Sequence, residues 1–239
     1  MGNFFTAAEH MGAPDMSEED YIKWLEEDPR RMKDVDERSE NRIMHAARHS
    51  FYNVVRLIHA HHHLIVSYTN YRGKSAMHRA AAVGDAEMIR LLHSLDSSLI
   101  NRWTTSRFYL PIHAAAKHGH VKAIEVLCEL GTNVDAMMHY EFYGIRAIEL
   151  ALKHEKWDAA LAILRCGSLS INGEFFKQSK HSNLKNSPMT LRLRYVLTGV
   201  WPPYVTFDRP TDEEVNEDRR CIFASDFRNP HTKPKPESK

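Results

Sequence analysis

Apolar residues recur along most of the chain in short blocks that have helical spacing. Within each block they fall at positions i, i+1, i+3 and i+4, which is the buried stripe of an amphipathic helix. Five blocks share this register: Tyr21–Leu25, Val54–Ile58, Met88–Leu92, Ala123–Leu127 and Ala159–Ile163. The pattern therefore predicts a regular series of helices.

A second, alanine-rich block precedes four of these stripes. Ser75–Asp85 superposes on Leu110–His120 at a spacing of 35 residues, and weaker copies lie at Asn41–Ala47 and Arg146–Leu152. In the two central copies a glycine separates the two helices, where a left-handed backbone is cheap only for glycine. The chain is therefore expected to consist of four helix-turn-helix units.

The two central units resemble the ankyrin repeat, which has about 33 residues, a T-P-L-H-x-A-A signature and a following Gly-His. The matching segments are Ala76–Ala81 with Gly84, and Pro111–Ala116 with Gly119-His120. The resemblance covers roughly residues 17–172. It implies an all-α solenoid of about four repeats with short hairpin loops, an N-terminal half-repeat cap and a C-terminal extension.

The outer units depart from this signature. Met44 and Glu149 occupy its histidine position, so these units should be less regular. The register gives these boundaries: a flexible segment with a lipidation pattern at 1–16, a capping half repeat at 17–36, repeats at 37–69, 70–105, 106–139 and 140–172, an extension packing on the last repeat at 173–228, and a disordered tail at 229–239.

Composition narrows the class of protein. Thirty-two basic and 31 acidic side chains give a net charge of +1, which does not favour nucleic-acid binding through bulk electrostatics. The apolar runs are far shorter than the roughly 20 residues of a bilayer helix, and no signal peptide is evident. We therefore expect the protein in the cytoplasm, with a location in the nucleus as an alternative. The charge is uneven, because residues 15–40 carry 11 acidic and 5 basic side chains.

The cysteines and most histidines give no sign of catalysis. Cys128, Cys166 and Cys221 are odd in number and form no C-x-x-C pair, so reduced thiols are expected. The ankyrin resemblance implies that His78 and His113 hydrogen-bond the backbone of neighbouring hairpins. No nucleophile elbow, H-E-x-x-H, Walker or G-x-G-x-x-G motif is present, so we predict neither an enzyme nor a cofactor.

The run His59-Ala60-His61-His62-His63 is the one candidate metal cluster, since adjacent imidazoles can share a borderline cation. It falls where a second helix is expected to run into a solvated turn, and acidic ligands are not close in sequence. Adventitious metal capture is the favoured interpretation, and a metal-dependent protein remains an alternative.

A candidate binding face follows from the resemblance. In ankyrin stacks, the two positions after the Ala-Ala pair line the concave face together with the hairpin tips. In three units these positions hold a basic residue and a histidine, namely Arg48-His49, Lys117-His118 and Lys153-His154. The hairpin tips add Tyr71, Arg72, Lys74, Arg107, Tyr109, Tyr140, Phe142 and Tyr143. We therefore expect a monomeric scaffold that binds another protein, through an acidic or phosphorylated segment.

Both ends suggest further roles. Met1–Thr6 fits the N-myristoylation pattern, with Gly2 as the acceptor, and one such chain gives only reversible membrane attachment. Ser187–Leu191 followed by Trp201-Pro202-Pro203 faintly resembles a SOCS box, which makes a ubiquitin-ligase substrate receptor an alternative. However, Tyr195 stands where that motif has its cysteine. Residues 191–197 alternate as in a strand, with a capping helix also open.

Overall fold

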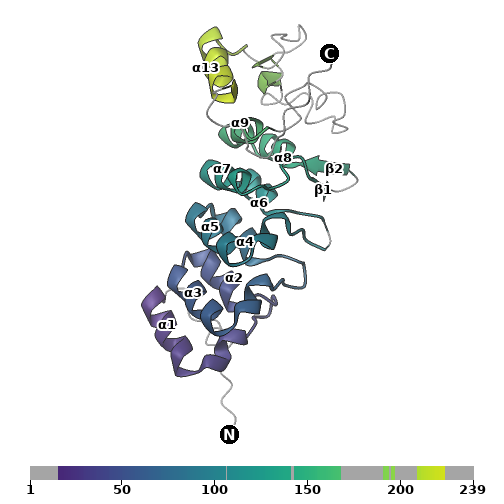
Figure 1. Cartoon of the computed structure of the whole chain (residues 1–239). Coiled ribbons are helices and arrows are strands. Elements are labelled where there is room, and N and C mark those ends of the chain that lie inside the picture. Colours follow the sequence, from purple (N-terminus) through teal and green to yellow (C-terminus); the bar gives the residue numbers. More distant parts are fainter. Residues whose placement is uncertain are drawn as a thin grey trace, which may run out of the picture.

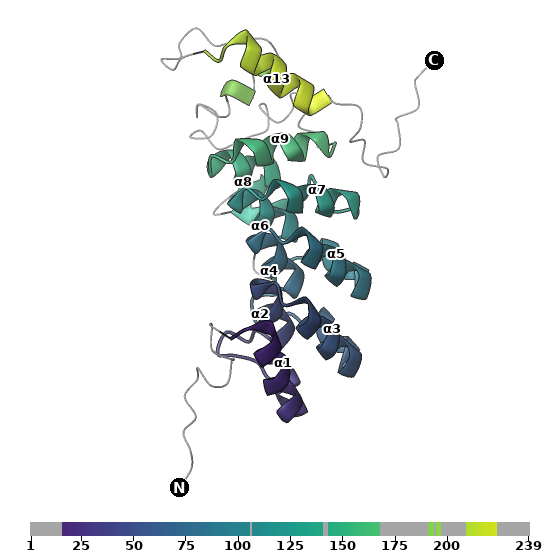
Figure 2. The same ribbon diagram turned by 90° about the vertical axis from the view of Figure 1, so that its left-hand side faces the viewer.

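The computed structural model describes residues 16–105, 107–140, 143–167, 191–193, 195–196 and 209–223. The helices form a stack of antiparallel pairs, which Figures 1 and 2 show from two directions. Inner helices pack on inner helices and outer helices on outer ones along the stack. The inner row is α2 (Arg42–His49), α4 (Ala76–Val83), α6 (Pro111–His118) and α8 (Ala147–Lys153). The outer row is α3 (Tyr52–His61), α5 (Ala86–Leu95), α7 (Val121–Glu129) and α9 (Trp157–Arg165).

The remaining elements lie at the ends of the stack and between repeats. Helix α1 (Glu18–Glu27) packs on α3, and α13 (Asp212–Phe223) packs on α9. Short 3-10 helices are η1 (Pro29–Lys33), η2 (His63–Ser67) and η3 (Ser97–Asn101). Strands β1 (Met137–Tyr140) and β2 (Tyr143–Arg146) pair antiparallel in the hairpin before α8. The architecture confirms the predicted all-α solenoid. No described helix has the length and apolarity that crossing a membrane would require.

The signature histidines join each central repeat to the next hairpin. His78 Nδ1 accepts the N–H of Ser75 at 3.1 Å, which caps α4, while Nε2 lies 2.9 Å from the carbonyl oxygen of Tyr109. His113 repeats this arrangement with the N–H of Leu110 and the carbonyl oxygen of Ala136, each at 3.1 Å. Each imidazole therefore caps its own helix and positions the following loop.

The outer repeats keep the helix cap with different side chains. The Asn41 side chain accepts the N–H of Met44 at 2.9 Å at the start of α2. Glu149 Oε2 accepts the N–H of Arg146 at 2.7 Å at the start of α8. Replacement of the signature histidine therefore leaves the first turn of these helices capped.

The turns between paired helices show the predicted left-handed residues. Gly84 has φ +89° and Gly119 has φ +83°, and each donates its N–H to the helix it ends. Ser50 and Glu155 adopt the same region in the outer repeats, at φ +59° and +57°. Here the fold imposes on L-residues a conformation that glycine adopts more readily.

A short helical segment and α13 cover the last repeat. Residues 191–193 and 195–196 are helical, so the helix and not the strand is correct there. Leu193 and Val196, three residues apart, are both buried, as expected for one helix face. Asp218 of α13 accepts the Trp157 indole N–H at 3.1 Å and pairs with Arg192 at 2.9 Å.

The expectation of reduced thiols is wrong for two cysteines. Cys128 and Cys166 form a disulfide, with their Cα atoms 5.9 Å apart, and both are buried. They stand at the ends of α7 and α9, which are equivalent places in successive repeats. Stacking brings such positions together although they are 38 residues apart in sequence. Sequence spacing without the repeat register gives no sign of this proximity.

Candidate functional site

A cavity of about 830 Å³ opens between the hairpin tips and the inner helices of the central and last repeats. It is lined by Tyr71, Arg72, Lys74, Thr104, Thr105, Arg107, Tyr109, Lys117, Met138, Leu150 and His154. Seven of these residues were predicted as binding residues: Tyr71, Arg72, Lys74, Arg107, Tyr109, Lys117 and His154. The stacking of repeats therefore brings residues from three units to one pocket.

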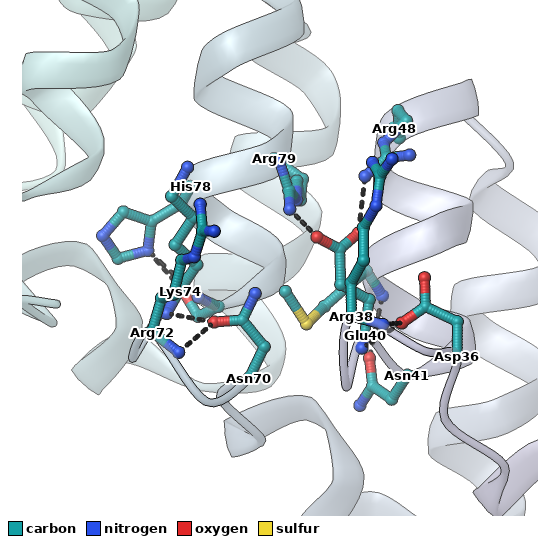
Figure 3. A network of polar contacts seen from close by, with 12 residues as sticks. Asp36, Arg38, Glu40, Asn41, Arg48, Asn70, Arg72, Lys74, His78 and Arg79 are labelled. Atoms are coloured by element: carbon teal, nitrogen blue, oxygen red, sulfur yellow. Dashed lines mark hydrogen bonds and ion pairs between the residues drawn. The ribbon is translucent and has the colours of Figure 1, made fainter. Parts of the chain in front are cut away.

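Asn70 holds the hairpin tip that carries the pocket residues Arg72 and Lys74. Its buried side chain accepts the N–H groups of Arg72 and Lys74, both at 3.0 Å, as Figure 3 shows. The backbone carbonyl oxygen of Asn70 accepts the N–H of Gly73, which has φ +75°. The carbonyl oxygen of Arg72 in turn accepts the N–H of Thr105 at 3.3 Å, which ties this tip to the next one. The backbone that carries Arg72 and Lys74 is therefore fixed before any ligand arrives.

Thr104 and Tyr109 form part of the pocket wall. Thr104 Oγ1 accepts the N–H of Tyr109, and its own N–H donates to the Tyr109 carbonyl oxygen, both at 3.0 Å. The Tyr109 ring lies 6.2 Å from the His78 ring and 5.6 Å from the His113 ring, measured between centroids. Burial raises the pKa of Tyr109 above its ordinary value. The signature histidines thus position a pocket residue.

The charge of the pocket is one-sided. Arg72, Lys74, Arg107 and Lys117 line it, and no Asp or Glu is found among the described residues of its wall. None of these four cations takes part in an ion pair within the described part of the chain. Burial lowers the pKa of Lys74, and the charges of Arg72 and Lys117 lower it further. Among the described residues, the pocket is therefore a concentration of positive charge with no carboxylate in its wall.

His154 adds a titratable group to the same wall. Burial lowers the pKa of His154 below 6.5, and the charges of Lys117 and Lys153 act in the same direction. The lowered pKa favours the neutral form of the imidazole. Its protonation at lower pH would add a further positive charge beside Lys117.

The predicted stripe does not continue evenly towards the N-terminus. Arg48 pairs with Glu40 at 2.5 Å, and Arg79 contacts the other oxygen of the same carboxylate (Figure 3). The Glu40 side chain is only 2% exposed. Asp36 Oδ1 accepts the N–H of Glu40 at 2.6 Å and so holds this segment in place. Arg48 is consequently engaged within the molecule and lies outside the pocket wall.

Three other predicted binding residues, His49, His118 and Lys153, are not among the residues that line the pocket. His49 contacts His45 and Phe51, with ring centroids 4.6 and 5.7 Å away, and burial lowers its pKa. His118 lies 6.0 Å from the His120 ring, and Lys153 is exposed on α8. Tyr140 and Tyr143 pair in the β1–β2 hairpin, but their side chains, Phe142 and Gly2 lie outside the description.

Sequence reasoning missed several pocket residues and the counterion. Thr104 and Thr105 come just before the predicted tip, and Met138 and Leu150 supply an apolar floor. The threonines could have been found by extending the tip to its full hairpin. In the sequence, Glu40 is one of several acidic residues in the segment 15–40. No sequence pattern indicates that its side chain pairs with Arg48 and Arg79.

Exposed aromatic residues flank the pocket. Trp103 is 62% exposed and Phe108 40% exposed, and their rings meet edge to face at 5.8 Å. They adjoin the pocket residues Thr104, Arg107 and Tyr109 in the same hairpin. Phe108 has φ +50°, a left-handed conformation that is uncommon for a bulky residue. Tyr71, at the pocket wall itself, is 61% exposed.

The histidine run does not assemble a metal site. His61 and His63 are exposed at the end of α3, and the rings of His61 and His62 lie 6.5 Å apart. Among the described residues, no three His, Cys, Asp or Glu side chains are grouped so that they could hold a metal ion. Most of the SOCS-like segment at 187–204 lies outside the described residues.

Comparison with known protein families gives a match to the central part of the chain. Residues 43–138 match the family model for ankyrin repeats, in three copies. This range runs from the second residue of α2 through α7 and reaches the pocket residue Met138 in β1. No curated protein matches the sequence.

Proposed function

Because the chain belongs to the ankyrin-repeat family, whose repeats are protein–protein interaction modules, we propose that it is a non-catalytic scaffold that binds an acidic segment of another protein. The observation that carries this proposal is the pocket with four cations and no carboxylate among its described wall residues. The ligand-binding surface is the pocket with the adjoining hairpin tips.

Electrostatics favour an anionic ligand. Cations that line one pocket repel one another, and the partial burial of Lys74 removes water that would otherwise screen its charge. A carboxylate entering the pocket relieves this repulsion and forms charge-assisted hydrogen bonds, which are stronger than neutral ones. The lowered pKa of Lys74 reflects the same burial and repulsion.

Preorganisation favours binding without a large entropic cost. Asn70 fixes one tip through two hydrogen bonds, and Thr104 fixes the next. Ordering loops during binding consumes part of the interaction free energy, so walls that are already ordered leave more of it as affinity.

A charge-reversal experiment tests the proposal. Lys117→Glu places a carboxylate in the pocket, whereas Lys122→Glu makes the same charge change on the exposed side of α7. A fluorescently labelled peptide rich in Glu and Asp is titrated with each protein, and anisotropy is measured. We expect Lys117→Glu to weaken binding more than about tenfold, with Lys122→Glu close to wild type. Equal affinities for the two variants would contradict the proposed site.

A further inference from the structure

We propose that the pocket recognises a phosphorylated serine or threonine within the partner segment. This inference rests on the proposed function, because it specifies which anionic group occupies the same pocket. It starts from the number of cations, their origin on separate units and the exposed aromatic residues beside them.

The charge of the pocket exceeds what one carboxylate neutralises. Arg72 and Lys74 come from one hairpin, Arg107 from the next and Lys117 from helix α6. A carboxylate carries one negative charge and two acceptor oxygens, whereas a phosphorylated side chain carries about −1.5 to −2 at pH 7 and three acceptor oxygens. The phosphoryl group therefore matches donors that converge from several directions.

The donor types fit this group as well. The guanidinium groups of Arg72 and Arg107 can each present two parallel N–H groups to phosphate oxygens. Lys74 and Lys117 act as compact charges, and the exposed Thr105 at the wall carries a hydroxyl that can donate. This combination is the usual chemistry of phosphate recognition in proteins.

The surroundings favour a peptide over a polyanion or a bilayer. The segment 15–40 has six more acidic than basic side chains, so a long nucleic acid or an anionic membrane beside it would be repelled. The exposed rings of Tyr71, Trp103 and Phe108 adjoin the pocket and offer contact area to residues that flank the phosphorylated one. Aromatic residues of this kind are common anchors in protein interfaces.

Three matched peptide pools test the inference. Each pool has the same degenerate flanks and a fixed central serine, glutamate or phosphoserine. Fluorescence anisotropy gives their affinities for wild type, Lys117→Glu and Lys122→Glu. We expect the phosphoserine pool to bind wild type about tenfold more tightly than the glutamate pool and the serine pool to bind least. Only Lys117→Glu should lose this preference, while circular dichroism shows all three proteins folded.

The possible contradictions are distinct. Equal affinity for the glutamate and phosphoserine pools would overturn phosphate recognition and leave the acidic-segment proposal standing. Failure of both pools to bind at millimolar concentration would overturn both proposals. Inorganic phosphate binding as tightly as the phosphoserine pool would overturn the peptide as the source. Preferential binding of vesicles containing a phosphoinositide would assign the pocket to a lipid headgroup.

Discussion

Two groups of cations on this molecule differ in whether the chain supplies their counterion. Arg48 and Arg79 share the buried carboxylate of Glu40, whereas Arg72, Lys74, Arg107 and Lys117 surround a cavity with no described acid in its wall. Similar residue types therefore have two roles. The first group holds two inner helices and the segment before them together, and the second is the group that we propose contacts a ligand.

The difference explains why the basic stripe predicted from the repeat register lines the pocket only in part. Equivalent positions in successive repeats point the same way, but a single acidic residue from the preceding segment decides which cations are already satisfied. Removing one partner of a buried ion pair leaves an uncompensated charge, so such pairs are costly to break. Within the described part of the chain, the pocket cations form no such ion pair.

The largest expected effect comes from removing the counterion of the first group. Glu40→Gln leaves Arg48 and Arg79 without their carboxylate, so we expect the free energy of unfolding to fall by about 3 kcal/mol. The urea midpoint measures this loss. Glu37→Gln is the control, because Glu37 is exposed in the same segment. A midpoint for Glu40→Gln equal to that of Glu37→Gln would remove the distinction between the two groups.

The second largest expected effect is a pH dependence of the free energy of unfolding, caused by the buried histidines His78 and His113. Burial lowers the pKa of His78 and of His113 from 6.5 to about 4. Between these values the unfolded chain binds more protons than the folded one, so the free energy of unfolding falls as the pH falls from 6.5 to 4. We expect a slope of about 1.4 kcal/mol per pH unit for each histidine.

Urea unfolding at pH 7, 6 and 5 measures this slope. His113→Asn should remove the contribution of His113 to this slope. The control His63→Asn, at an exposed position, should leave the slope unchanged. A stability that is flat from pH 7 to 5 would show that these imidazoles are not held neutral by the fold.

A third prediction compares one member of each group by binding. Lys117→Gln should lower the affinity for an acidic peptide about tenfold, because a charge-assisted contact between the lysine and a peptide carboxylate is lost. Arg48→Gln should change the affinity less than about twofold, since Arg48 is already paired with Glu40 and lies outside the pocket wall. Calorimetric titration of both variants measures the contrast. Equal losses would mean that the cations of the two groups act as one surface.

The smallest expected effect concerns His154. Burial lowers its pKa, and a bound carboxylate would raise it, so binding should take up a proton. An acidic peptide should therefore bind about twofold to threefold more tightly at pH 6 than at pH 7.5. His154→Gln should abolish this dependence, and a dependence that survives in the variant would assign it to another group.

Much of the fold was predictable because its signals are local and repeated. The apolar stripes, the left-handed glycines and the two signature histidines each depend on residues within one unit. The disulfide between Cys128 and Cys166 was not predictable from spacing alone, since it depends on two helix ends lying side by side in the stack. Leu191, Leu193, Tyr195 and Val196 are buried, and the alternating pattern of this segment does not reveal the helix.

The site was predictable to the extent that it follows repeat register. Register placed Lys117 and the tip residues Arg72 and Arg107 on one face, where the pocket brings them together. It also placed Arg48 there, without the means to detect that Glu40 faces it. Long-range pairing of charges depends on the path of the chain outside the repeats, which no local pattern encodes.

Photo-crosslinking tests most directly which group of cations receives a ligand. A Glu-rich peptide carrying benzoylphenylalanine next to its acidic residues is irradiated with the protein, and the adducts are mapped by mass spectrometry. We predict adducts within residues 71–74 and 103–109, which form the pocket and its aromatic border. Adducts centred on residues 38–48, or spread over the outer helices, would contradict the account.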